Sequence, residues 1–276
     1  MTGQAVIRAL VRRGVRPRAA VRVPDQLTLF ADLADPVIAD FSDEAQLAEA
    51  FAGVDAAYYI PPAFNAAEPQ FAANVIAAAE RTSLPRLVYH SVLHAATPGM
   101  RHHARKAAVE VMLRESSLTW TILQPAMYMQ TPLFFLNAER TELNPAFNAD
   151  RVFTPVDLLD VGEVAASILT TQGHDFATYE LSGGEPVSFR DMAHILSVVF
   201  ARPVTSNPLN LADLIRRLSA ARSLSENAVL DLSAMLTYYD RHGLRGNSAV
   251  LRMILGRDPT SFETAARRTL SSAPAA

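Results

Sequence analysis

Residues 35–62 read "DPVIADFSDEAQLAEAFAGVDAAYYIPP" and decide the fold, because they hold a strand, a helix and a second strand in succession. The apolar residues of 35–43 predict a strand with polar residues at its carboxyl end. Alanine and leucine then recur at helical spacing from 44 to Gly53, and 54–62 predicts a strand stopped by two prolines. Two strands joined by a helix are typical of a parallel sheet.

The same alternation extends over most of the chain. Further strands are predicted at 16–23, 86–93, 119–125 and 178–184, and helices at 1–14, 68–83, 101–116, 156–170 and 188–200. We therefore expect an α/β fold: a Rossmann-like doubly wound parallel sheet with a smaller, mostly helical C-terminal lobe. The predicted core comprises 1–130 and 151–183, and the predicted lobe comprises 131–150 and 184–276.

Composition narrows the function classes. Half of the residues are apolar and 19% are charged, as in an ordinary globular protein, and no run approaches the length of a membrane helix. The net charge of −3 gives no basic surface for nucleic acid as a property of the whole chain. The absence of cysteine excludes disulfides and thiol chemistry and fits the cytoplasm. We expect a small-molecule substrate, no nucleic acid and no membrane, and leave a homodimer open.

Lysine use is unusual. The chain has 25 basic residues, of which Lys106 is the single lysine. Arginine cannot replace lysine where a compact, titratable amine is needed, so Lys106 is a candidate functional residue. Coding bias with one residual lysine is the alternative. The seven histidines show no zinc-ligand spacing, and no metal site is expected.

Several stretches together resemble the NmrA-like family of atypical short-chain dehydrogenases, which includes NAD(P)H-dependent quinone reductases and redox-sensing regulators. The stretches are "AVIRALVRRG" (5–14), "RAAVR" (18–22), "VIADFSDEAQLAEAFAGVDAAYYIPP" (37–62), "RLVYHSVL" (86–93), "HHARKAAVEVMLRESSLTWTILQPAMYM" (102–129) and "LGRDPTSFETAARR" (255–268). Each match is weak, but their order and spacing are specific and span nearly the whole chain.

The resemblance implies a strand and a GATGxxG loop ahead of the first helix, and "MTG" matches only the end of that loop. Gly3 would be its last glycine. In the strand order 3-2-1-4-5-6 the missing strand would be central, between 16–23 and 54–60. We expect that the reading frame begins upstream of Met1; the alternative is a chain that binds cofactor poorly.

The resemblance also implies that the cofactor is NADP or NAD. Arg22 lies where the family contacts the ribose 2′-phosphate, and a guanidinium matches phosphate geometry. Asp40 and Phe41 lie where the family flanks the adenine. The remaining predicted cofactor contacts follow three other strands: Ile60, Pro61 and Pro62, then Ser91, then Gln124 and Ala126, with Lys106 on the helix between.

The segment "RHHARKAAVE" (101–110) carries the predicted catalytic residues. Typical short-chain dehydrogenases have Tyr-x-x-x-Lys here, a spacing that puts both side chains on one helix face. Lys106 is present, but His102 stands in the tyrosine position, where it could donate a proton near neutral pH or be an exposed surface histidine. Ser91 is the third predicted catalytic residue, with its hydroxyl expected near the nicotinamide, and a turn residue is the alternative.

The substrate side of the cleft is predicted to contain Met127, Tyr128 and Phe134, for which core packing is the alternative role. These residues predict an NAD(P)H-dependent oxidoreductase acting on a quinone-like or other small carbonyl acceptor. The alternative is a non-catalytic NAD(P) redox sensor whose C-terminal lobe docks a protein partner.

Overall fold

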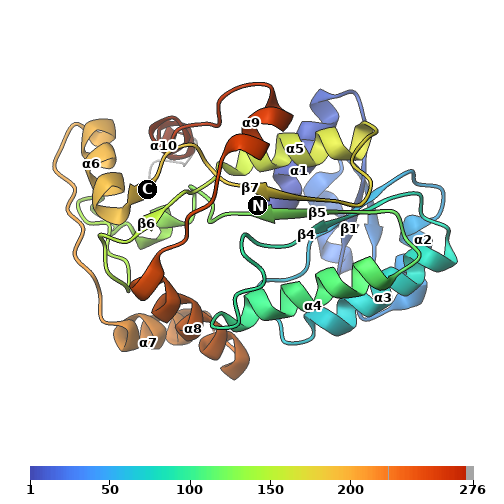
Figure 1. Cartoon of the computed structure of the whole chain (residues 1–276), viewed down its shortest axis with the longest axis horizontal. Helices are drawn as coiled ribbons and strands as arrows, with labels where there is room; N and C mark the ends of the chain where they lie inside the picture. Colours follow the sequence, from blue (N-terminus) through green and yellow to red (C-terminus); the bar gives the residue numbers. More distant parts are fainter. Residues whose placement is uncertain (223, 272–276) are drawn as a thin grey trace.

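Figure 1 shows the computed structural model, which describes residues 1–222 and 224–271. The helices are α1 (Thr2–Arg12), α2 (Glu44–Phe51), α3 (Glu68–Arg81), α4 (Arg101–Glu115), α5 (Leu158–Thr170), α6 (Phe189–Phe200), α7 (Leu211–Arg222), α8 (Glu226–His242), α9 (Ala249–Leu255) and α10 (Phe262–Ser271), with short 3₁₀ helices η1 (Pro24–Phe30) and η2 (Pro132–Phe135). The strands are β1 (Arg18–Val21), β2 (Asp35–Ile38), β3 (Ala57–Tyr59), β4 (Leu87–His90), β5 (Trp120–Pro125), β6 (Val152–Phe153), β7 (Ala177–Leu181) and β8 (Val187–Ser188).

The strands form a parallel α/β architecture, as predicted. Strands β3, β4, β5 and β7 pair in that order, all parallel, while β1 and β2 form a second parallel pair. Helices α1 and α5 cover one face of the larger sheet, and α2, α3 and α4 lie on the other (Figure 1). Val88 and Leu123 are fully buried on the first face, and Leu87, Tyr89 and Ile122 on the second.

The order of the strands divides between β1 and β3. Both strands would flank the predicted central strand, and in the described part of the chain they belong to separate hydrogen-bonded sheets. The strand order on either side matches the doubly wound pattern. The strand and glycine loop expected ahead of Met1 stay a prediction.

The ends of several helices follow from their local chemistry. Gly14 and Gly53 directly follow the C-caps of α1 and α2 with φ values of 77° and 71°, a left-handed conformation that favours glycine. Asp43 caps α2 by accepting hydrogen bonds from the backbone N–H groups of Ala45 and Gln46. Ser188 begins α6 with a complete capping box.

Four elements differ from the prediction. The segment 54–62 is strand only over β3, and η1 was not predicted because 24–30 carries neither helical nor alternating periodicity. The antiparallel pair β6–β8 was missed because two-residue strands give no periodic pattern.

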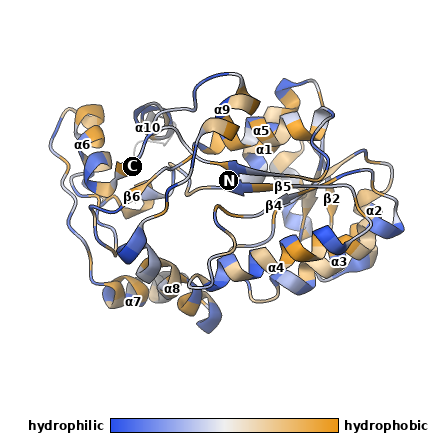
Figure 2. Cartoon of the chain, in the orientation of Figure 1, coloured by the Kyte–Doolittle hydropathy of each residue, from blue (hydrophilic) through white to orange (hydrophobic). Residues whose placement is uncertain are grey.

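Helices α6 to α10 follow the sheet in sequence, as the helical pattern beyond residue 183 predicts. Figure 2 shows hydrophobic and hydrophilic residues mixed along α3 and α4, as helices with one buried face require. Within residues 1–222 and 224–271, no helix combines the length and apolar character that crossing a bilayer demands. The proposed domain boundaries stay a prediction.

Candidate active site

The predicted site residues gather at one edge of the parallel strands. Arg22, Asp40, Ile60, Ser91 and Gln124 each lie at or just beyond the carboxyl end of a strand. Carboxyl ends of parallel strands share an edge, which is where ligands bind in open α/β sheets. The N-terminus of α1 reaches the same region, because the Thr2 hydroxyl donates to the Tyr128 hydroxyl at 3.2 Å.

Lys106 projects from α4 into a buried cluster. Its Nζ donates to Glu68 Oε1 at 2.9 Å and to the backbone oxygen of His90 at 3.3 Å. The Tyr89 hydroxyl donates to the same Glu68 oxygen at 2.9 Å. The Glu68 side chain is 1% exposed and that of Lys106 is 13% exposed. Burial lowers the pKa of Lys106, and the adjacent Glu68 carboxylate opposes that shift.

His102 lies one helical turn before Lys106 and is buried rather than exposed. Its ring contacts Phe64 edge-on, with 5.0 Å between the ring centroids, and packs against His103. Burial lowers the pKa of His102 to about 3, with smaller contributions from His103 and Lys106, so the ring is neutral at pH 7. A proton donated from His102 would therefore come from a neutral imidazole, which is a much weaker acid than the imidazolium.

Ser91 and Gln124 share one carboxylate. The Ser91 hydroxyl donates to Glu110 Oε1 at 2.5 Å, and Gln124 Nε2 donates to the same oxygen at 2.7 Å. Arg114 donates to the second oxygen of Glu110. Ser91 and Glu110 are both buried. Because the Ser91 hydroxyl donates to Glu110, its proton points toward that carboxylate in the structure.

His90, the last residue of β4, joins two tyrosines. Its Nδ1 lies 2.5 Å from the Tyr58 hydroxyl and its Nε2 lies 2.6 Å from the Tyr128 hydroxyl. Burial, and secondarily the charge of Lys106, lowers the pKa of His90 to about 3. Burial also raises the pKa of Tyr58 and brings that of Tyr128 to about 12. All three groups are therefore neutral at pH 7.

On the predicted adenosine side, Arg22 is exposed and its charge acts on Asp40. Asp40 Oδ1 accepts hydrogen bonds from the Ser42 backbone N–H at 2.8 Å and from its hydroxyl at 2.6 Å. These bonds lower the pKa of Asp40, so it is ionised and able to accept from an amine. Phe41 packs edge-on against Tyr59, with centroids 5.1 Å apart.

The start of α1 suits a diphosphate. Within the described residues, α1 begins without a side-chain cap and has no acidic residue in its first turn, and helix N-termini of this kind attract anions. A Cβ at Gly3 would lie 4.0 Å from Ile60 Cδ1, an ordinary contact. Pro61 is buried and Pro62 exposed beyond Ile60. The helix start, Arg22 and ionised Asp40 thus fit the phosphates and adenine of a dinucleotide.

The predicted substrate residues lie in different environments. Met127 and Tyr128 are partly buried against the main core, and the neighbouring Ala126 is buried within it. The Phe134 side chain is 66% exposed, whereas Phe135 packs edge-on against Phe189.

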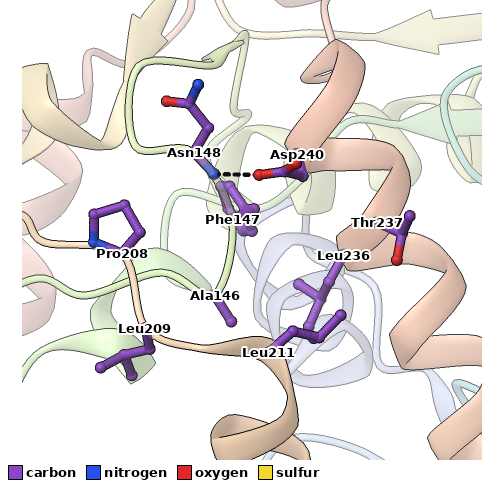
Figure 3. Close-up of a pocket in the computed structure, with 9 residues that line it drawn as sticks. All are labelled: Ala146, Phe147, Asn148, Pro208, Leu209, Leu211, Leu236, Thr237 and Asp240. Atoms are coloured by element: carbon purple, nitrogen blue, oxygen red, sulfur yellow. Dashed lines mark hydrogen bonds between the residues drawn. The ribbon is translucent and has the colours of Figure 1, made fainter.

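The described residues also form two cavities. One of about 420 Å³ lies between the loop at 146–148, the segment 208–211 and α8, away from the predicted site residues (Figure 3). The other, of about 340 Å³, is lined by residues 63–66 and by the start of α8. Phe64, which contacts His102, lines this second cavity, so the cavity borders the site.

Sequence reasoning missed the partners of the predicted residues. The five missed side chains are all polar and converge on the site from β3, α3, β4 and α4: Tyr58, Glu68, Tyr89, His90 and Glu110. His90 could have been found as a polar residue at the carboxyl end of a predicted strand. Glu68 gives no such signal, because an acidic residue at a helix start is common.

Comparison with known proteins assigns the family. Residues 1–172 match the model of the NAD(P)H-binding family, which is more than half of the chain. The chain belongs to this family. Membership of an NAD(P)H-binding family agrees with what the resemblance implies.

Three relatives are reductases. The chain is 29% identical to (4-alkanoyl-5-oxo-2,5-dihydrofuran-3-yl)methyl phosphate reductase of Streptomyces griseus, covering 70% of this chain and 69% of the relative. It is 27% identical to the NAD(P)H azoreductase of Xenophilus azovorans, covering 73% and 71%. It is 26% identical to quinone oxidoreductase 2 of Escherichia coli, covering 81% and 78%.

The solved structure of the E. coli quinone oxidoreductase 2 with NADPH shares the fold. It superposes with a TM-score of 0.84 at 24% identity, covering 98% of this chain and 95% of the other. The α/β Rossmann-like sheet with a C-terminal helical region is thus common to both proteins.

Proposed function

We propose that the protein is an NAD(P)H-dependent oxidoreductase that reduces a quinone-like or other small carbonyl acceptor. The observation that carries this proposal is the contact between Thr2 and Tyr128. This contact places the uncapped start of α1, which suits a diphosphate, beside the Tyr128 hydroxyl. That hydroxyl is hydrogen-bonded to buried His90. Binding and proton-donating groups therefore lie at one edge of the sheet.

The dinucleotide, when bound, supplies a hydride to the acceptor. In the proposed arrangement the start of α1 with Gly3 holds the diphosphate, Arg22 the 2′-phosphate, and Asp40 and Phe41 the adenine. Ser91, Gln124 and Lys106 line the nicotinamide end, where Lys106 supplies positive charge. Met127, Tyr128 and Phe134 are proposed to contact the acceptor, and the Tyr128 hydroxyl accepts a hydrogen bond from Thr2 at the helix start.

The test is NADPH oxidation by the purified chain with a panel of quinones and small carbonyl compounds, alongside equilibrium binding of NADPH measured by its fluorescence. Turnover with any acceptor supports the proposal. Binding without turnover across the panel would contradict it and favour the non-catalytic redox sensor, whose partner would be a protein. Absence of binding would contradict both.

The proposed role of Arg22 predicts a preference between cofactors. Replacing Arg22 with alanine is expected to weaken NADPH binding about tenfold, because a charge-assisted contact to phosphate is lost. NADH lacks that phosphate, so its dissociation constant should stay nearly unchanged. Equilibrium titration of both cofactors measures the difference, and the Arg12→Ala variant, at an exposed arginine on α1, serves as the control. Equal weakening for NADPH and NADH would rule out a 2′-phosphate contact.

A further inference from the structure

Tyr58, His90 and Tyr128 form a continuous hydrogen-bonded chain that crosses an apolar part of the core. The two contacts measure 2.5 Å at His90 Nδ1 and 2.6 Å at His90 Nε2. Tyr58 and Tyr128 pack against the same hydrophobic cluster that contains fully buried Val88 and Leu123. A sheet normally packs apolar side chains against such a cluster. The presence of three linked polar side chains there therefore suggests a chemical role.

The neutral imidazole of His90 has one N–H and one bare nitrogen. With a tyrosine on each side, one phenol must donate to the ring while the ring donates to the other. Two arrangements are therefore possible, and they differ only in the direction of the bonds and in the tautomer of His90. Switching between them transfers a proton through the ring without creating a charged imidazolium.

We propose that Tyr58, His90 and Tyr128 are a proton relay that serves acceptor reduction, with Tyr128 as the group that touches the acceptor. The inference rests on the proposed function. Tyr128 is the end that meets α1, through Thr2, and neither tyrosine is fully buried. His90 acts through Tyr128 and is a positioning and relay residue.

The steps balance. A quinone that accepts a hydride from NAD(P)H gains two electrons and becomes the hydroquinone monoanion, and the Tyr128 hydroxyl gives its proton to that oxygen. The Tyr128 oxygen takes the proton from His90 Nε2, while His90 Nδ1 takes the proton of the Tyr58 hydroxyl. Tyr58 recovers a proton from water. These transfers leave His90 protonated on Nδ1, and exchange of the ring proton with water between turnovers restores the Nε2–H tautomer. The sum is quinone, NAD(P)H and one proton converted to hydroquinone and NAD(P)⁺.

The decisive variant is His90→Gln. A glutamine amide can accept from one tyrosine and donate to the other, so the contacts survive, but an amide does not pass a proton by tautomer exchange. We expect kcat to fall about 100-fold, at the lower end of the range of general-acid effects, with an unchanged NADPH dissociation constant and melting temperature. Tyr58→Phe should lower kcat similarly and reduce the solvent deuterium isotope effect. Full activity and an unchanged isotope effect in His90→Gln would overturn the relay.

A second readout does not depend on turnover. The ¹⁵N shifts of His90, assigned by comparison with His90→Gln, report which ring nitrogen carries the proton. Losing the Tyr58 hydroxyl should bias His90 toward one tautomer, and Tyr128→Phe should bias it the opposite way. Identical ¹⁵N shifts in both tyrosine variants would overturn the relay even if the protein reduced no acceptor. Opposite shifts in a protein that reduces no acceptor would contradict the proposed function and not the hydrogen-bonded chain.

Discussion

Replacing Lys106 with methionine is expected to lower the free energy of unfolding by about 3 kcal/mol, because it leaves a buried carboxylate without its cation. Glu68 is 1% exposed, and the Lys106 ammonium lies 2.9 Å from its Oε1. In Lys106→Met, Tyr89 still donates to that oxygen, but one neutral donor does not compensate a buried negative charge. Urea denaturation at pH 7.5 measures the loss.

A double variant separates charge burial from packing. Adding Glu68→Gln to Lys106→Met removes the unpaired charge, so most of the lost stability should return. The exposed pair of Arg190 and Asp150 is the matched control, and Arg190→Met should leave stability nearly unchanged. If Lys106→Met proved as stable as the wild type, the buried ion pair would make no net contribution to the free energy of unfolding. The double variant also provides a folded protein in which the catalytic role of Lys106 can be measured.

Much of the fold was predictable because each element carries its own local pattern. Gly14 and Gly53 end α1 and α2 with positive φ, and Ser188 caps α6, all as the sequence indicates. The parallel order of β3, β4, β5 and β7 follows from helices of about a dozen residues between strands. Strand length was overestimated, since β3 is three residues within the predicted 54–62.

The site was predictable where residues share one helix or lie at the carboxyl ends of parallel strands. The spacing of His102 and Lys106 places both on α4, and both are indeed partly or fully buried. Their partners come from other elements: Glu68 from α3 and His90 from β4 are brought to Lys106 by tertiary packing, which no local pattern encodes. The protonation state of His102 likewise depends on burial by Phe64 and its neighbours. The assigned roles of the site residues stay predictions.

Lowering the pH from 7 to 5 is expected to destabilise the protein by about 6 kcal/mol, through three buried histidines. Burial is the first cause in each case, and it lowers the pKa from 6.5 to about 3 for His90 and His102 and to about 4 for His103. The folded protein keeps these rings neutral, whereas the unfolded chain binds a proton at each below pH 6.5. Stability is therefore fully present above pH 6.5 and falls by about 1.4 kcal/mol per histidine per pH unit as the pH drops.

The window between pH 6.5 and 5 isolates the histidines. Asp40 and Asp191 have lowered pKa values in the folded state, so their contributions are lost only as the pH falls through and below the ordinary aspartate value of 3.8. Urea unfolding at a series of pH values gives the number of protons taken up, which should approach three for the buried histidines, with a further contribution from partly buried His174, whose pKa burial also lowers. The His102→Leu variant should reduce that number by about one. Uptake of fewer than one proton would mean that the buried histidines titrate alike in the folded and unfolded chains.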